Sequence, residues 1–164
     1  MFNFTEATAL LGLVIAARLI EAMMARRNAE RLIEEGAEDR SGDFYLMWMA
    51  LQGGGLFLIA AMMNPDRAPP LGAILLFAPL FLARVGLLVR YRRNWVTRLM
   101  TTANGDLIDP VPGQYRTLTR GLSALEAAAL PLVLGLPFVA LALGVLHAAF
   151  IAYRSRLERA LARG

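Results

Sequence analysis

Three charged side chains interrupt otherwise apolar stretches of this sequence and are its first candidates for chemistry. Arg18 and Glu21 follow the apolar run from Ala7 to Ala17 in the first segment, and Arg84 lies in the stretch from Leu71 to Val89. Arg18 and Glu21 are three residues apart, so on a helix they share a face and can form an ion pair. A charge inside a membrane costs about 2.5–3.5 kcal/mol on insertion scales. Such residues therefore either have a functional role, or their cost is offset because they form ion pairs or extend their charged ends to the lipid headgroups.

The composition excludes several kinds of catalytic and metal chemistry. The 164 residues contain no Cys and a single His, and all 17 basic residues are Arg. These absences exclude thiol nucleophiles, disulfides, His-based metal cages and lysine Schiff bases, so we expect no bound metal. The single His147 lies in an apolar stretch, where a hydrogen bond between helices is its expected role. Soluble-enzyme motifs such as GxGxxG, the Walker sequence and HExxH are absent.

The balance of apolar and charged residues is typical of a membrane protein. Hydrophobic residues make up 57% and charged residues 18% of the chain, and the mean hydropathy is +0.51. Soluble domains are about half apolar and about a quarter charged. The net charge of +4 comes from arginines that flank apolar runs, which is the distribution of a membrane protein and does not indicate a nucleic-acid partner.

The apolar segments predict an all-α, polytopic integral membrane protein that forms one membrane domain over residues 1–164. A spanning helix needs about 20 mostly apolar residues. Glu126 opens the predicted fourth helix, where a carboxylate favours the positive end of the helix dipole. We expect about five transmembrane helices and a cytoplasmic-side loop at 100–121, with the helices at about 4–28, 44–63, 70–99, 122–135 and 138–162.

The last apolar run, from Ala127 to Ala152, could form one tilted helix or a helical hairpin. Pro131, Gly135 and Pro137 lie close together within it and favour the hairpin. The arginine distribution places the N-terminus outside and three segments inside, namely loop 25–43, region 90–120 and the C-terminal tail. Only an even number of crossings between the last two segments fits this distribution, so the arginines also favour the hairpin.

The three inside segments bring polar and aromatic side chains to one membrane surface. A polar cofactor could reach this surface from the cytosol, and a lipophilic acceptor could reach it from the bilayer. The basic run 90–98 is expected to anchor the chain to anionic membrane lipids. The candidates on this surface include Arg27, Asn28, Glu38, Arg92, Trp95, Arg98, Tyr115, Arg116 and Glu158.

Short motifs along most of the chain resemble one family. The bacterial isoprenylcysteine carboxyl methyltransferase-like family is similar to this chain at Arg18-Leu-Ile-Glu21, Ala25-Arg-Arg-Asn28, Tyr45-Leu-Met-Trp48, Asn94-Trp-Val-Thr-Arg98, Gly113-Gln-Tyr-Arg116 and Leu125-Glu-Ala-Ala-Ala-Leu-Pro-Leu132. The resemblance covers nearly the whole chain in the right order. It implies a small helical membrane fold with a C-terminal hairpin, located in the bacterial inner membrane.

The resemblance also implies a reaction and a cofactor. Active members of this family transfer a methyl group from S-adenosylmethionine to a lipophilic acceptor, such as the carboxylate of a prenylated cysteine. An Arg-His-Pro-x-Tyr motif and two adjacent glutamates hold the cofactor there. In this chain the His and Pro are missing, and Leu157-Glu158 replaces the glutamate pair. The cofactor-binding positions that carry over are Tyr115, Arg116, Arg120 and Glu158, with Arg27, Asn28, Trp95 and Arg98 as candidates for substrate contact.

Two functional hypotheses follow from these departures. In the first, the chain is a non-catalytic membrane scaffold or accessory subunit that packs against a larger membrane complex and needs no cofactor. Gly53-Gly-Gly55 suits such packing, because it allows a close approach between helices. In the alternative, the chain remains a methyltransferase that uses S-adenosylmethionine in a rebuilt pocket. A carboxylate acceptor needs positioning more than a strong base, so the loss of the His does not forbid the reaction.

Overall fold

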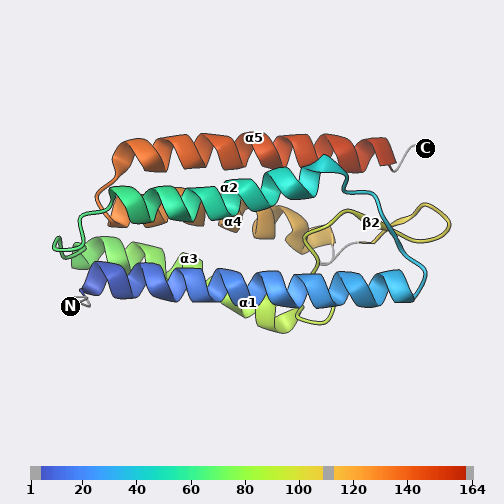
Figure 1. The fold of residues 1–164 in the computed structure, drawn as a ribbon, viewed down its shortest axis with the longest axis horizontal. Coiled ribbons are helices and arrows are strands. Elements are labelled where there is room, and N and C mark those ends of the chain that lie inside the picture. Colours follow the sequence, from blue (N-terminus) through green and yellow to red (C-terminus); the bar gives the residue numbers. More distant parts are fainter. Residues whose placement is uncertain (1–4, 109–112, 162–164) are drawn as a thin grey trace.

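Five helices run along one long axis and form the body of the protein (Figure 1). The computed structural model describes residues 5–108 and 113–161, with residues 113, 114 and 116 described by their backbone alone. The predicted all-α fold is confirmed. The helices are α1 (Glu6–Glu34), α2 (Asp43–Met62), α3 (Leu71–Arg90), α4 (Gly113–Val133) and α5 (Pro137–Leu161).

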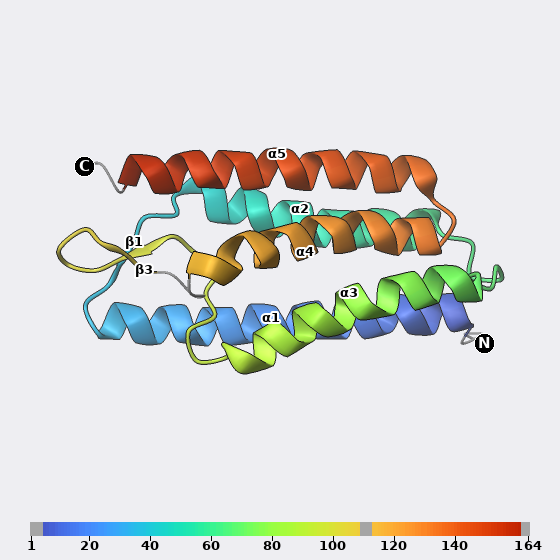
Figure 2. The ribbon, with the colours of Figure 1, turned by 180° about the vertical axis from the view of Figure 1, so that it is seen from behind.

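Four of the helices are long and apolar enough to cross a membrane. Among the described residues these are α1, α2, α3 and α5. Large apolar side chains point outward from the bundle; Phe57 is 75% exposed and Phe138 is 86% exposed. Such an outer surface is unfavourable in water and typical of helices surrounded by lipid. The fold is therefore that of a helical membrane protein, in which α4 packs against both α3 and α5 (Figure 2).

A small antiparallel sheet lies at one end of the bundle. Its strands are β1 (Glu38–Asp39), β2 (Met100–Thr101) and β3 (Leu107–Ile108), with β2 in the centre. The C-terminal ends of α1 and α5 lie at this end, which we call the sheet end, and the start of α1 and the α4–α5 turn lie at the opposite end (Figure 1). The predicted convergence of loop 25–43, region 90–120 and the tail is thus confirmed.

The C-terminal hairpin is also confirmed. α4 ends at Val133. The N–H of Gly135 then donates to the carbonyl oxygen of Leu132 at 3.0 Å, and the N–H of Leu136 donates to the carbonyl oxygen of Pro131 at 2.8 Å. This pair of bonds is a Schellman motif, which requires a left-handed residue after the helix. Gly135 supplies it with a φ of +77°, and α5 starts at Pro137.

We expect Gly135→Ala to weaken this turn by about 1–2 kcal/mol, because a side chain at positive φ is strained. An added Cβ would also lie 2.6 Å from Nη1 of Arg67, although that flexible side chain can move away. The matched control is Gly72→Ala at the same end, where no atom lies within 4 Å of the added Cβ. Thermal unfolding in detergent checks the prediction, and equal stability of the two variants would contradict it.

Three predicted helix boundaries are wrong at the sheet end. The third helix was predicted to reach residue 99, but α3 ends at Arg90 and is followed by a turn. The chain leaves the helix so that Trp95, Val96 and Leu99 become buried inside the protein. The amide of Asn28 holds this reversal by donating to the carbonyls of Arg92 at 2.7 Å and Trp95 at 2.9 Å.

The predicted loop at 100–121 is partly helical. Its polar composition suggested a loop, but α4 already begins at Gly113, whereas the prediction placed its start at 122. The polar first half of α4 lies towards the sheet end, where Arg120 faces Glu158 of α5. The first half of α4 is therefore held against α5 by an ion pair, which a pattern of apolar residues does not predict. The first helix also runs further than residue 28, to Glu34.

Candidate functional site

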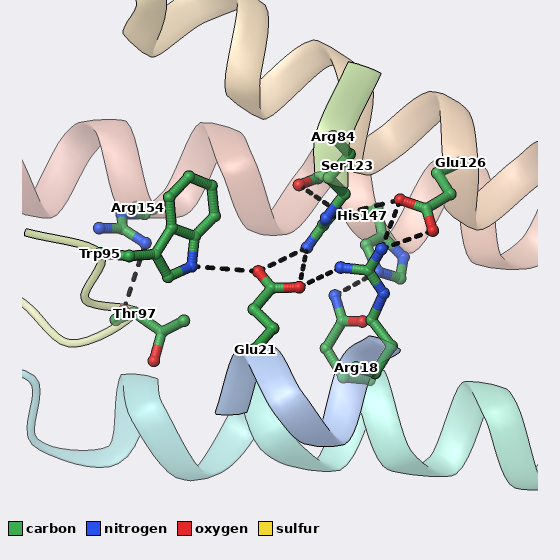
Figure 3. A network of polar contacts seen from close by, with 10 residues as sticks. Arg18, Glu21, Arg84, Trp95, Thr97, Ser123, Glu126, His147 and Arg154 are labelled. Carbon is green, nitrogen blue, oxygen red and sulfur yellow. Dashed lines mark hydrogen bonds and ion pairs between the residues drawn. The ribbon is translucent and has the colours of Figure 1, made fainter. Parts of the chain in front are cut away.

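A cluster of four buried charges joins three helices in the middle of the bundle (Figure 3). We call it the buried quartet: Arg18 and Glu21 of α1, Arg84 of α3 and Glu126 of α4. Nη2 of Arg84 donates to both carboxylate oxygens of Glu21 at 3.0 and 3.1 Å. Nη2 of Arg18 donates to both oxygens of Glu126 at 2.6 and 2.9 Å, and Arg18 also pairs with Glu21. Two positive and two negative charges therefore balance.

The balance explains how these charges are tolerated inside an apolar protein. Their side chains are 5–13% exposed, and a buried charge is tolerated only when paired and hydrogen-bonded. The expected Arg18–Glu21 pair is present. The dipole role expected for Glu126 is wrong, because Glu126 lies well inside α4 and binds Arg18 instead.

Two neutral groups complete the quartet. The indole Nε1 of Trp95 donates to Glu21 at 3.2 Å, and Nη1 of Arg84 donates to the hydroxyl of Ser123. Nε of Arg84 is buried, lies 3.5 Å from a Glu126 oxygen and makes no hydrogen bond. The bond from Trp95 explains why the chain folds back after α3.

A second ion cluster ties α4 to α5 towards the sheet end. The buried carboxylate of Glu158 accepts from Nη2 of Arg120 at 2.6 Å and from Nε of Arg154 at 2.9 Å. Arg120 also donates to the hydroxyl of Ser155 at 3.0 Å, and Arg154 donates to the carbonyl of Thr97 at 3.3 Å. Two cofactor-binding candidates from the sequence, Arg120 and Glu158, therefore lie together.

A cleft lies between the two ion clusters. Its empty volume, including its open mouth, is about 700 Å³. Arg120, Arg154 and Thr119 line it beside the second cluster, and Glu21 and Arg84 line it beside the buried quartet. The cleft thus offers guanidinium groups and a hydroxyl, together with aromatic rings from Phe44, Trp48, Trp95 and Phe150.

An apolar groove runs between α1 and α2. Its empty volume is about 1080 Å³, and most of its lining is apolar, including Leu19, Leu56 and Phe57. Tyr45 and Ala60 mark its extent along α2. The groove and the cleft share four lining residues, which are Glu21, Trp48, Arg84 and Thr97. The two cavities are therefore adjacent beside the buried quartet.

The predicted substrate-contact residues separate in the structure. Trp95 lines the cleft, whereas Asn28 holds the turn after α3 and Arg27 is exposed on α1. Arg98 pairs with Asp39 at 2.6 Å, and its guanidinium lies 4.5 Å from the ring centre of Tyr45. Of these four candidates, only Trp95 is placed to touch a molecule in the cleft.

The remaining cofactor candidates lie on the first turns of α4. Tyr115 is exposed, and its ring centre is 6.1 Å from that of Tyr91, outside the cleft lining. Arg116 belongs to the helix, but its side chain lies outside the described residues. Thr119 and Ser123 line the cleft and were not predicted. Their spacing of four residues, with Glu126 three residues further on, was a helix-face signal that could have found them.

Asp39 of the sheet has a lowered pKa. Its partial burial alone would raise the pKa of the carboxyl, but hydrogen bonds from Ser41 and the ion pair with Arg98 outweigh burial and lower it. A lowered pKa contributes stability that is present above the ordinary value, 3.8, and is lost as pH falls through the folded-state value.

We therefore expect Asp39→Asn to cost about 0.5 kcal/mol at pH 6, because a partly exposed ion pair is screened by water. The difference between the variant and the unmodified protein should shrink as the pH falls below 3.8 and through the lowered folded-state pKa, because Asp39 then becomes protonated in both folded and unfolded states. Unfolding measured at several pH values tests the sign. A difference that grows as the pH falls would contradict it.

The described residues contain no group of three His, Cys, Asp or Glu side chains that could hold a metal ion. The fold and the site define an all-α membrane protein in which a polar cleft and an apolar groove lie side by side at a buried ion network. No protein-family model matches the chain, and no curated protein or solved structure matches it either.

Proposed function

We propose that this protein is an S-adenosylmethionine-dependent methyltransferase that acts on a lipophilic acceptor, as its resemblance to the isoprenylcysteine carboxyl methyltransferase-like family implies. The observation that carries the proposal is that the cleft and the groove share Glu21, Trp48, Arg84 and Thr97. A reaction between a polar donor and a membrane-dissolved acceptor needs two such cavities that meet. Holding both reactants in line is the main contribution of an enzyme to this transfer.

The residues of the cleft fit the chemical groups of this cofactor. Arg120 and Arg154 can bind its carboxylate. The faces of Trp48 and Trp95 can attract its positively charged sulfonium. The hydroxyls of Thr97, Thr119 and Ser123 can bond to its ribose and amino groups. When bound, the cofactor supplies the methyl group, and the protein orients it and excludes water.

The arginines support an inner-membrane location with the sheet end in the cytosol and the N-terminus outside. Basic residues gather on the cytoplasmic side of membrane proteins. The opposite end carries Arg67 in its α2–α3 turn. Exposed arginines at or near the sheet end are Arg26, Arg27, Arg31, Arg40, Arg90, Arg92, Arg93, Arg156 and Arg159, and they suit contact with anionic headgroups.

One observation favours the second candidate, a non-catalytic scaffold or accessory subunit. Both oxygens of Glu158 already accept from Arg120, and Arg154 binds the same carboxylate. A carboxylate held in this way has little capacity left for a cofactor. In a scaffold the same cluster would serve only to lock α4 to α5.

Calorimetric titration of the purified protein with S-adenosylmethionine and its demethylated product separates the two candidates. We expect saturable binding that Thr119→Trp weakens at least tenfold, because the indole fills the cleft. The matched control is Leu118→Trp, whose side chain is 50% exposed on the outer face of α4 and should leave binding unchanged. No binding at millimolar ligand, with co-purification in a stoichiometric complex, would favour the scaffold.

A further inference from the structure

Gln52 is a polar side chain in the middle of an apolar span. It lies on α2 (Asp43–Met62) and lines the groove between α1 and α2. It also lines a smaller cavity inside the bundle, together with His147 of α5. Gln52 therefore lies between the groove and this smaller cavity.

The hydrogen bonds of His147 fix the orientation of the Gln52 amide. Nδ1 of His147 is 2.9 Å from the carbonyl oxygen of Leu143, which can only accept, so Nδ1 carries the proton. In the neutral ring Nε2 is then an acceptor. Nε2 of Gln52 lies 3.1 Å from it and must be the donor. His147 is 2% exposed, and the ring of Trp48 contacts it edge-on, so the ring is held in place.

This orientation leaves the amide oxygen of Gln52 without a donor. No described residue donates a hydrogen bond to it, and it is not fully enclosed by protein. Its groove neighbours include the apolar side chains of Met49 and Leu56. In the hydrocarbon region no water can supply the missing bond, and an unpaired polar group is costly there. A donor on the molecule in the groove would satisfy it.

We infer that Gln52 recognises a hydroxyl group on a long-chain lipophilic molecule bound in this groove, with the hydroxyl donating to Oε1 of Gln52. The inference rests on the proposed function, which places a lipophilic molecule there. Tyr45 and Ala60 are 15 positions apart on α2, or roughly 22 Å along a helix. Gln52 lies near the midpoint, so the hydroxyl belongs within the chain of the ligand and not at its end.

Displacement of brominated lipid tests this inference in vesicles. The protein is reconstituted in dibrominated phosphatidylcholine, which quenches tryptophan, and Trp48 in the groove wall is one of only two tryptophans. Methyl 12-hydroxystearate and methyl 12-methoxystearate are then added as matched probes that differ in one donor. We expect recovery of fluorescence at about fivefold to tenfold lower concentration for the hydroxy ester, the effect of one hydrogen bond.

Variants identify the group that is responsible. Gln52→Leu should bind both esters equally, and Met49→Leu, one turn away in the same groove, should keep the preference. His147→Leu, which frees the amide to rotate, should reduce it. Equal recovery of fluorescence by both esters in the unmodified protein, or a preference for the hydroxy ester that survives Gln52→Leu, would overturn the role of Gln52. Neither result would contradict the proposed function. If neither ester restores fluorescence, the groove does not take up such chains from the bilayer, which overturns the inference and also removes the acceptor site that the proposed function needs.

Discussion

Replacing Arg84 with Met should lower the free energy of unfolding by about 3–5 kcal/mol, the cost of breaking a buried ion pair from one side. Arg84 bonds both oxygens of Glu21 and lies beside Glu126, and its side chain is 7% exposed. The variant would leave Arg18 alone to balance two carboxylates. Met keeps much of the length of the side chain, so the loss reports charge and hydrogen bonding more than volume.

Two variants control for this result in unfolding experiments in mixed detergent. Arg90→Met makes the same change at the exposed end of α3 and should stay within about 0.5 kcal/mol of the unmodified protein. Adding Glu21→Gln to Arg84→Met should recover part of the loss, because it removes one unpaired charge. An Arg84→Met protein as stable as Arg90→Met would show that the quartet is not held in a dry interior.

Replacing Glu158 with Ala should cost about 1.5–3 kcal/mol, the range for hydrogen bonds to charged groups. Glu158 holds Arg120 of α4 and Arg154 of α5 on one carboxylate. Without it, the two guanidinium groups would repel each other across the cleft. Because the cluster is partly exposed, we expect the damage to be local, with faster hydrogen exchange in the last turns of α5.

A second substitution in the same cluster provides the control for Glu158→Ala. The double variant Glu158→Ala/Arg120→Met removes the repulsion between the two guanidinium groups and should partly restore slow hydrogen exchange. Arg159→Ala, one residue along and exposed, should leave exchange unchanged. Fast exchange that spreads through α1 and α3, or a combined variant weaker than the sum of its parts, would contradict this account of the cluster.

Apolar length and turn residues were enough to predict most of the fold. The segment at 44–63 became α2 over Asp43–Met62, and Pro131 and Gly135 marked the turn of the hairpin. The errors lie where long-range polar contacts override local pattern. Trp95 leaves the helical path to reach Glu21, and the polar residues before 122 join α4.

The site was only partly predictable for the same reason. Arg18, Glu21 and Arg84 stood out because a charge in an apolar run needs a partner. Glu126 is one of the partners of Arg18, but it lies 108 positions away in the sequence. Patterns of neighbouring residues therefore cannot connect the two. A single amide such as Gln52 does not indicate a role by its position in the sequence, and only the ring orientation of His147 shows which atom of the amide is left without a partner.

The meeting of cleft and groove is tested most directly by labelling single cysteines. The chain has no Cys of its own, so each introduced thiol reports one position. Thr119→Cys lines the cleft alone, Gly53→Cys lines the groove alone, and Thr97→Cys lines both. A charged, membrane-impermeant maleimide and a long-chain alkyl maleimide dissolved in the bilayer serve as the two probes.

We predict that Thr119→Cys reacts with the charged reagent applied at the sheet end, that Gly53→Cys reacts with the alkyl reagent, and that Thr97→Cys reacts with both. Either reagent should then block the other at Thr97→Cys, because both reach the same thiol. If the thiol at position 97 reacts with only one of the two reagents, the cavities do not meet, and a reaction between a polar donor and a membrane-dissolved acceptor could not take place there.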